Sequence, residues 1–249
     1  MIPFWQFLTA HVVGDFVFQS ERMVAGKRDG SWGAFLAHGG VHLATLAVIT
    51  WPFLSGRLVL AWGVVVAAHL VLDGLKEAAG RQFRSLAGAV WLFLVDQIVH
   101  VVIVLQVLLW LGPFPADGPL LWTVLGTEGA RLWAPWLLSS RTWQVAAIYG
   151  YTLAAAAILI RLVLQAAGLE GGRPSQAGIT RAGTWIGILE RGLILSLLLV
   201  RAEAAVGFVL AAKSIARFKE LEERAFAEYY LVGTLLSAGI ALLGFLALR

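Results

Sequence analysis

All five histidines of the chain lie within its first 100 residues, and each has a carboxylate or another histidine four positions away. Spacings of three and four residues place side chains on one face of a helix. Four apolar stretches are therefore predicted to form helices that each carry a single polar stripe. The stripes are His11-x3-Asp15-x3-Gln19, His38-x3-His42, His69-x3-Asp73-x2-Lys76 and Asp96-Gln97-x2-His100.

These residue types are the ligand set of a divalent metal ion. Neutral imidazoles and carboxylates, in a chain without cysteine, suit zinc, manganese, iron or nickel. Two such side chains at positions i and i+4 can clamp one ion, and the ion would neutralise carboxylates whose charge burial disfavours. We expect a divalent ion, with zinc or manganese favoured. The candidate ligands are His11, Asp15, His42, His69, Asp73 and His100.

The remaining polar residues of the stripes are candidates for supporting or catalytic roles. Gln19, Gln97 and His38 are expected to orient the ligands through hydrogen bonds; the alternative for His38 is an ordinary residue near a helix boundary. Asp96 is a candidate ligand or general base. Lys76 is a candidate group for binding a phosphate or carboxylate, and its alternative is a lysine that extends to lipid headgroups.

The composition indicates the solvent in which these helices must fold. Hydrophobic residues make up 59% of the 249 residues, charged residues only 14%, and the mean hydropathy is +0.81. Globular chains have about 45–50% apolar and about 25% charged residues, so this chain has too little charge to cover a water-facing surface. Its 11 tryptophans suit a membrane, because indole rings gather at the headgroup boundary. Basic residues are scattered among short loops, which argues against nucleic acid as a partner.

Apolar stretches of about 20 residues are long enough to cross a bilayer. They predict an all-α fold, a polytopic transmembrane helical bundle with seven to eight spans. The predicted spans are 2–19, 34–54, 58–78, 87–111, 142–167, 183–200 and 229–248, with a short eighth at 204–217. The predicted parts are a four-helix domain with a His/Asp-lined pocket at 1–111, a Trp/Pro-rich outer interfacial segment at 112–141, and a second transmembrane domain at 142–249 with a short cytoplasmic helix at 218–228.

The four polar stripes are expected to converge. Most Lys and Arg residues lie in loops that are cytoplasmic if the N-terminus is outside, as membrane proteins prefer. In that orientation His11, His42, His69 and Asp96 lie at nearly one level, about 10–14 Å below the inner boundary by the helical rise. Ionisable groups inside a membrane turn toward the bundle interior. The sequence therefore predicts a polar pocket in the first four helices, open toward the cytoplasm.

Fewer polar residues interrupt the second half. Glu190 and Arg161 lie at comparable depth on neighbouring spans, which suggests an ion pair between helices. The favoured alternative is that these residues only support helix packing and extend toward the headgroups. Gly183-x3-Gly187 matches a motif of closely packed membrane helices.

The order of the motifs in the first half resembles a bacterial integral-membrane family catalogued as domain of unknown function 3307. The second half resembles longer members of that family at residues 187–191, 207–218 and 228–237. The resemblance implies a multi-pass protein of the bacterial inner membrane. It implies no activity, because the family is named for the absence of one.

Three functions fit these residues. The first is a metal-dependent hydrolase of a lipid-linked or phosphorylated substrate, with membrane lipids as its surroundings. The second is a cation or proton transporter or channel, since buried Asp and His also form relays. The third is a non-enzymatic scaffold in which the polar groups only fix helix packing. The outer halves of the first four spans hold few ionisable residues, which favours a one-sided site over a path through the membrane.

Overall fold

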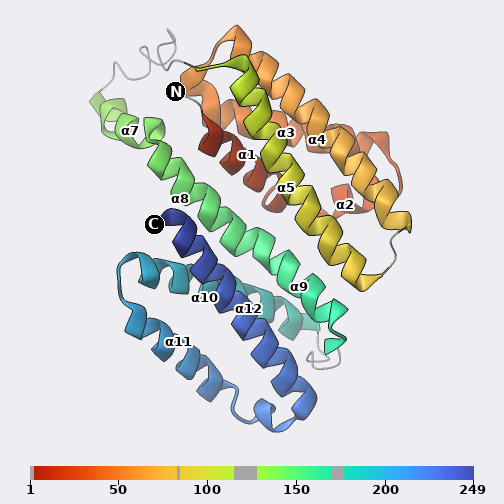
Figure 1. Cartoon of the computed structure of the whole chain (residues 1–249), viewed down its shortest axis with the longest axis vertical. Helices are drawn as coiled ribbons and strands as arrows, with labels where there is room; N and C mark the ends of the chain where they lie inside the picture. The colour runs from red at the N-terminus through yellow and green to blue at the C-terminus, as the bar shows by residue number, and fades with distance from the viewer. Residues whose placement is uncertain (1–2, 83–84, 115–127, 170–176) are drawn as a thin grey trace. The chain divides into compact units, whose positions relative to one another are not determined.

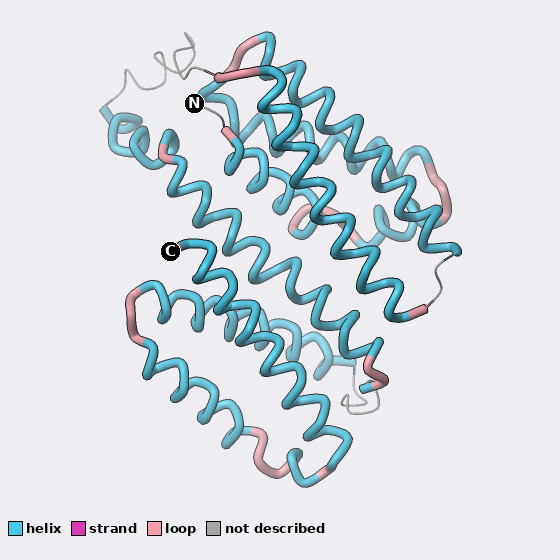
Figure 2. The backbone as a smooth tube through the Cα atoms, viewed as in Figure 1, coloured by secondary structure: helices cyan, strands magenta, loops and turns pink. Residues whose placement is uncertain are grey.

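The computed structural model describes residues 3–82, 85–114, 128–169 and 177–249. Throughout these ranges the regular structure is helical, which confirms the predicted all-α class (Figures 1 and 2). The helices of the N-terminal half are α1 (Phe4–Phe16), α2 (Glu21–Arg28), α3 (Trp32–Thr50), α4 (Gly56–Gln82) and α5 (Leu86–Leu111), with a short 3-10 helix η1 (Trp51–Phe53). They are followed by α7 (Glu128–Leu138), α8 (Ser140–Gly150), the π-helix η2 (Tyr151–Ala155), α9 (Ala156–Ala166), α10 (Ala177–Leu199), α11 (Glu203–Ala216), η4 (Glu220–Glu222) and α12 (Arg224–Leu248).

Within the described ranges, five helical segments are long and apolar enough to cross a membrane, by length and composition. They are Trp32–Phe53, Gly56–Gln82, Leu86–Leu111, Ser140–Ala166 and Arg224–Leu248. The predicted seven to eight spans are not confirmed. The predicted spans 2–19 and 204–217 correspond to α1 and α11, with 13 and 14 residues. Each is about 20 Å long, shorter than the roughly 30 Å hydrocarbon core of a bilayer.

The first helix ends earlier than predicted because a second helix begins where a loop was expected. Ser20 caps α2: its Oγ accepts a hydrogen bond from the Met23 backbone N at 3.3 Å. Glu21 in the first turn and basic residues in the last turn suit the helix dipole. The sequence thus carried the signals of an eight-residue helix after α1.

The chain divides into two compact units, Met1–Arg84 with Trp91–Ala147, and Ser85–Val90 with Ile148–Arg249. In the first unit α1 packs against α3, α3 packs against α4, and α2 contacts both α3 and α4. Fully buried apolar side chains fill one part of this unit, among them Phe7, Phe53, Leu58, Leu108 and Phe114. The second unit packs α10 against α11 and α12, and α12 against α9.

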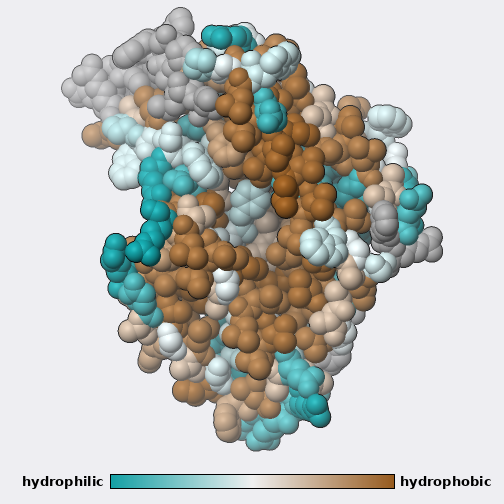
Figure 3. Space-filling view, in the orientation of Figure 1, coloured by the Kyte–Doolittle hydropathy of each residue, from teal (hydrophilic) through white to brown (hydrophobic). Residues whose placement is uncertain are grey.

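Large apolar side chains also cover the outside of the helices. The face drawn in Figure 3 is mostly hydrophobic, and hydrophilic residues lie mainly toward its edges. Trp32, Val48, Trp110 and Phe208 are each more than 70% exposed. Large apolar side chains are costly to expose to water but not to lipid, so this surface is compatible with a membrane protein.

Two local predictions need correction. No helix was predicted in the Trp/Pro-rich outer segment 112–141, because proline disrupts helices, yet Pro135 lies inside α7. Trp133 and Trp136 of that helix are exposed, while residues 115–127 lie outside the described ranges, as do 170–176 of the linker before α10. In place of one helix at 218–228 the chain forms η4, and the extended backbone of Glu223 (ψ 116°) then starts α12 at Arg224.

Candidate metal centre

The side chains of all five histidines meet inside the first unit, so the predicted convergence of the polar stripes is confirmed. The centroids of the His42 and His69 rings are 4.0 Å apart, and those of His69 and His100 are 4.4 Å apart. His11 stacks on His100 at 5.0 Å, and His38 lies 4.6 Å from His42. Each of these residues is at most 5% exposed. Helices α1, α3, α4 and α5 therefore contribute to one buried cluster, which we call the histidine cluster.

A glycine in α1 makes room for the cluster. A Cβ atom at Gly14 would lie 2.7 to 2.9 Å from three atoms of the His42 imidazole, closer than carbon atoms pack. Gly14 is itself buried, and its lack of a side chain lets the His42 ring lie against the backbone of α1.

Alanine at Gly14 is therefore expected to displace the His42 ring. We predict a loss of about 1–3 kcal/mol in unfolding free energy, the usual cost of overpacking. Unfolding in mixed micelles followed by circular dichroism would measure it. Gly40→Ala in α3 is the matched control, because a Cβ there meets nothing within 4 Å. Equal stability of both variants would contradict the proposed contact.

Asp15 lies at the centre of the histidine cluster. Its Oδ1 is 3.0 Å from His42 Nε2, 3.2 Å from His38 Nε2 and 3.4 Å from His69 Nε2. Its Oδ2 is 3.5 Å from His11 Nε2. One carboxylate therefore faces four imidazoles that come from three helices, although its side chain is only 11% exposed.

Asp73 is a second carboxylate beside His38, and it has a partner that the sequence pattern did not predict. Its Oδ2 is 3.3 Å from His38 Nε2 and 3.8 Å from His69 Nε2. The ammonium of Lys27 contacts the same oxygen at 2.5 Å, and Lys27 is only 6% exposed. The predicted spans left Lys27 in a cytoplasmic loop. Because α2 packs against α3 and α4, Lys27 is instead buried in the site.

Asp96 and Lys76 form a pair of their own beside the cluster. Lys76 Nζ donates to Asp96 Oδ2 at 2.8 Å, and the Gln97 amide donates to the same oxygen at 3.0 Å. Lys76 keeps 36% of its side chain exposed, whereas Asp96 is buried. Asp96 Oδ1 lies 3.5 Å from His100 Nδ1. The structure thus places both candidate catalytic residues at the site, and their catalytic roles stay predictions.

His38 and Gln19 also lie at the histidine cluster. His38 is completely buried, which excludes the reading of an ordinary residue at the boundary. The Gln19 amide nitrogen is 3.3 Å from His38 Nδ1. An amide at this distance can orient the ring, as predicted.

In the described part of the chain, three buried imidazole nitrogens of the cluster have no hydrogen-bond partner: His11 Nε2, His69 Nδ1 and His100 Nε2. His100 Nδ1 lies 2.8 Å from the Asp96 carbonyl oxygen and donates to it, so the neutral ring leaves a lone pair on Nε2. Buried polar atoms are normally satisfied. Unsatisfied nitrogens of this kind are available to bind a cation.

Hydrogen bonds alone do not satisfy the centre of the cluster either. His38 Nε2 and His69 Nε2 are only 2.9 Å apart, so one hydrogen must serve both atoms. The nitrogen without it then presents a lone pair to Asp15 Oδ1, which lies within 3.4 Å of each. A cation accepts several lone pairs at once. Ligand atoms about 3.3 Å apart are also what a tetrahedral ion with bonds of about 2.0–2.1 Å requires.

The cavity inside the histidine cluster is small. The cavity that borders His11, His42, His69 and His100 has a volume of only about 10 Å³, enough for roughly one water molecule. Phe7 and Leu46 form part of its wall. The cavity is small because the imidazoles pack closely against one another, and its opening toward the cytoplasm stays a prediction.

Comparison with known proteins identifies the segment that carries the cluster. Residues 4–115 match the family model described as "Protein of unknown function (DUF3307)". No curated protein matches the chain, and no solved structure matches it. The matched residues include every histidine and the three aspartates of the site. The resemblance of residues 187–191, 207–218 and 228–237 lies outside this match and stays a prediction. Residues 4–115, just under half of the chain, are thus similar to a protein family of unknown function, DUF3307.

Proposed function

We propose that the first unit is a membrane-embedded metal centre that binds a divalent transition-metal ion, zinc or manganese, and that it serves as a metal-dependent hydrolase of a phosphorylated or lipid-linked substrate. One observation carries the metal site: four imidazoles lie around the Asp15 carboxylate, and one of the nitrogens that face it, His11 Nε2, has no hydrogen-bond partner. Both residue types are ligands of these ions, and the described cluster contains no thiol to favour softer ones.

Three groups of side chains can hold an ion with one ligand atom each. The largest is His11, Asp15, His42 and His69, whose ligand atoms lie within 4.8 Å of one another. His38, His69 and Asp73 form a second group, and Asp73, Asp96 and His100 form a third. His69 and Asp73 each belong to two groups. Because His69 and Asp73 are shared between groups, the cluster can hold either one ion or two neighbouring ions.

The hydrolase part of the proposal rests on charge and on the one-sided position of the cluster. A bound ion polarises a phosphoryl or acyl bond and activates water. Lys76 is partly exposed at the edge of the site, where its ammonium can bind an anionic substrate group. In the described residues the neighbouring core is apolar, with Phe53, Leu58 and Leu108 fully buried. That core does not supply the continuous charged path that a cation or proton transporter needs.

Metal binding tests the first part of the proposal. We expect purified wild-type protein to retain zinc or manganese stoichiometrically after dialysis, and His69→Ala to retain much less, because His69 belongs to two ligand groups. Ligand at 100 times its Kd stabilises a fold by about 2.7 kcal/mol, so the metal should also raise the Tm of the wild type. Metal content by mass spectrometry and thermal unfolding measure both effects. A wild type that holds no ion, with a Tm indifferent to metal, would overturn the site.

Hydrolysis is tested separately. Phosphatidic acid and a polyprenyl diphosphate in mixed micelles are the probes, and release of inorganic phosphate is the readout. Metal-dependent release that disappears in His69→Ala supports the hydrolase. If the protein bound metal stoichiometrically but released no inorganic phosphate, hydrolysis of these two substrates would be excluded. The proposal of a metal centre would still stand.

A further inference from the structure

The second unit contains a large cavity that plays no part in the metal centre. We propose that it binds a membrane lipid with an anionic phosphate headgroup. The cavity has a volume of about 770 Å³ and lies among α9, α10, α11 and α12. This volume is within the range of about 300–1,000 Å³ typical of small-molecule sites. Its lining combines basic side chains with apolar ones, and the proposal is independent of the proposed function.

The charges that line the cavity are predominantly positive. Arg161, Arg191, Lys213 and Arg217 line it, against a single carboxylate, Glu190. Lys213 is neutralised, because its ammonium contacts Glu190 Oε2 at 2.5 Å. Arg217 pairs with Glu220 at 3.2 Å. Among the described residues, neither Arg161 nor Arg191 forms an ion pair, and Glu190, the neighbour of Arg191 in the chain, is already paired with Lys213. The cavity therefore keeps an excess of positive charge for another group to balance.

Arg191 is held in place by neutral groups. Its Nε and Nη2 each donate at 2.8 Å to backbone carbonyls of the π-helix η2, those of Thr152 and Leu153. The Arg191 residue is only 3% exposed. Carbonyl oxygens satisfy its hydrogens but do not cancel its charge. An uncancelled buried charge is costly in a membrane protein, and a bound anion would remove that cost.

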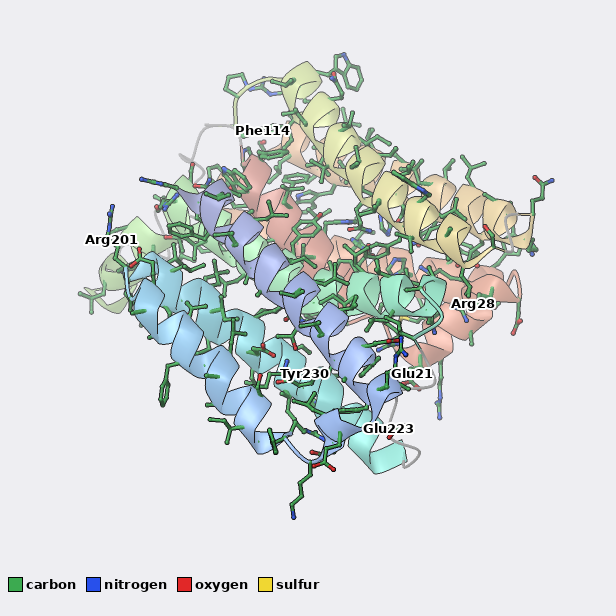
Figure 4. All side chains as sticks on the ribbon, turned by 60° about the horizontal axis from the view of Figure 1, so that its bottom comes forward. Glu21, Arg28, Phe114, Arg201, Glu223 and Tyr230 are labelled. Carbon is green, nitrogen blue, oxygen red and sulfur yellow. The ribbon has the colours of Figure 1, made fainter. Side chains whose placement is uncertain are left out.

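The ion pair between Glu190 and Arg161 that the sequence suggested does not form, and this affects the charges of the cavity. Glu190 was expected to pair with Arg161, but α11 brings Lys213 to it instead, where Lys213 also donates to Thr234 Oγ1 at 3.0 Å. The ammonium further lies 5.0 Å from the ring centroid of Tyr230, which Figure 4 labels on α12. Arg161 is thereby left available to a ligand.

Small residues on α10 create part of the volume. Gly183 and Gly187 both line the cavity, although the sequence suggested that this motif packs two helices together. A Cβ at Gly183 would meet nothing within 4 Å. Apolar side chains complete the wall, including Ile160, Leu164 and Phe226. The same cavity therefore offers guanidiniums to a phosphate and an apolar surface to an acyl chain, which is the chemistry of an anionic amphiphile.

Lipid titration tests this site. Full-length protein in a neutral detergent is titrated with phosphatidylglycerol or phosphatidylcholine, and bound lipid is counted by native mass spectrometry. We expect phosphatidylglycerol to bind at least about tenfold more tightly, and Arg161→Gln to remove about that factor, the value of one charge-assisted contact. Gly183→Leu, which fills the cavity, should also weaken binding. The matched controls are Arg224→Gln, an exposed arginine outside the cavity, and Gly207→Leu, where a Cβ likewise meets nothing within 4 Å.

Three results would overturn the proposal. Equal binding of the two lipids would exclude recognition of the anionic headgroup. Wild-type affinity in both Arg161→Gln and Gly183→Leu would place any bound lipid elsewhere. Competition by glycerol phosphate as strong as that by phosphatidylglycerol would show that the ligand is a water-soluble phosphate and that the apolar wall contributes nothing. Because metal is absent from this assay, failure here leaves the metal centre untouched.

Discussion

Replacing Asp15 by asparagine is expected to weaken zinc binding by about 100-fold or more, at or beyond the upper end of losses seen when groups that support a metal ligand are changed. Asp15 supplies an oxygen within 3.0 to 3.4 Å of three imidazole nitrogens. Asparagine keeps the size of the side chain and removes its negative charge, so the helices should stay packed while the cation loses its central anionic ligand. Competition between the protein and a fluorescent zinc chelator measures the affinity.

Asp29→Asn is the matched control for this experiment. Asp29 is exposed at the end of α2, in the same unit, and its loss removes the same charge from the chain. We expect its zinc affinity to equal that of the wild type. If Asp15→Asn bound zinc as tightly as Asp29→Asn, Asp15 would not be a ligand, and the cluster would be a hydrogen-bonded network instead.

Replacing Lys27 by methionine is expected to lower the free energy of unfolding by about 3–5 kcal/mol in metal-free protein, the usual result of leaving one partner of a buried ion pair uncompensated. Lys27 and Asp73 are both buried, and their contact is among the shortest polar contacts of the site. Methionine fills much of the same space, so the loss reports the charge. Denaturation in mixed micelles containing a chelator measures it.

Two comparisons separate charge from packing. Arg28→Met removes the neighbouring exposed arginine and should cost little. The double variant Lys27→Met/Asp73→Leu removes both charges and should recover most of the lost stability, because apolar replacement of a whole buried pair is often neutral. A double variant no more stable than Lys27→Met would mean that Lys27 acts through packing alone. Zinc should partly rescue the single variant, since a cation beside Asp73 replaces the missing ammonium.

The sequence was sufficient to predict most of the histidine cluster. Four stripes with spacings of three and four residues identified His11, Asp15, His69 and His100 as neighbours, and the structure brings them together. Two physical reasons explain this success. The helical repeat is fixed by the backbone, and lipid cannot solvate ionisable groups, so buried polar stripes have only the bundle interior to face.

Lys27 shows where such reasoning stops. Lys27 lies between Gly26 and Arg28 in a short polar helix that connects two longer ones, and polar connections of this kind are usually solvated. Its burial depends on α2 lying against α3, where a Cβ at Gly26 would be 2.7 Å from the Cβ of Ala34. No helical period encodes that approach, because it is a contact between separate segments.

By itself, then, the sequence determined the membrane-like composition, the helical class and the residues of the histidine cluster, because composition and periodicity act locally along the chain. The tertiary structure alone decided which charges meet. Helix packing buried Lys27 against Asp73 and left a cavity of only about 10 Å³ beside the histidines. It also paired Glu190 with Lys213 and not with Arg161. Helix packing decides which of several basic side chains of equal charge comes within hydrogen-bond distance of a carboxylate. That side chain forms the ion pair, because electrostatic attraction falls with distance.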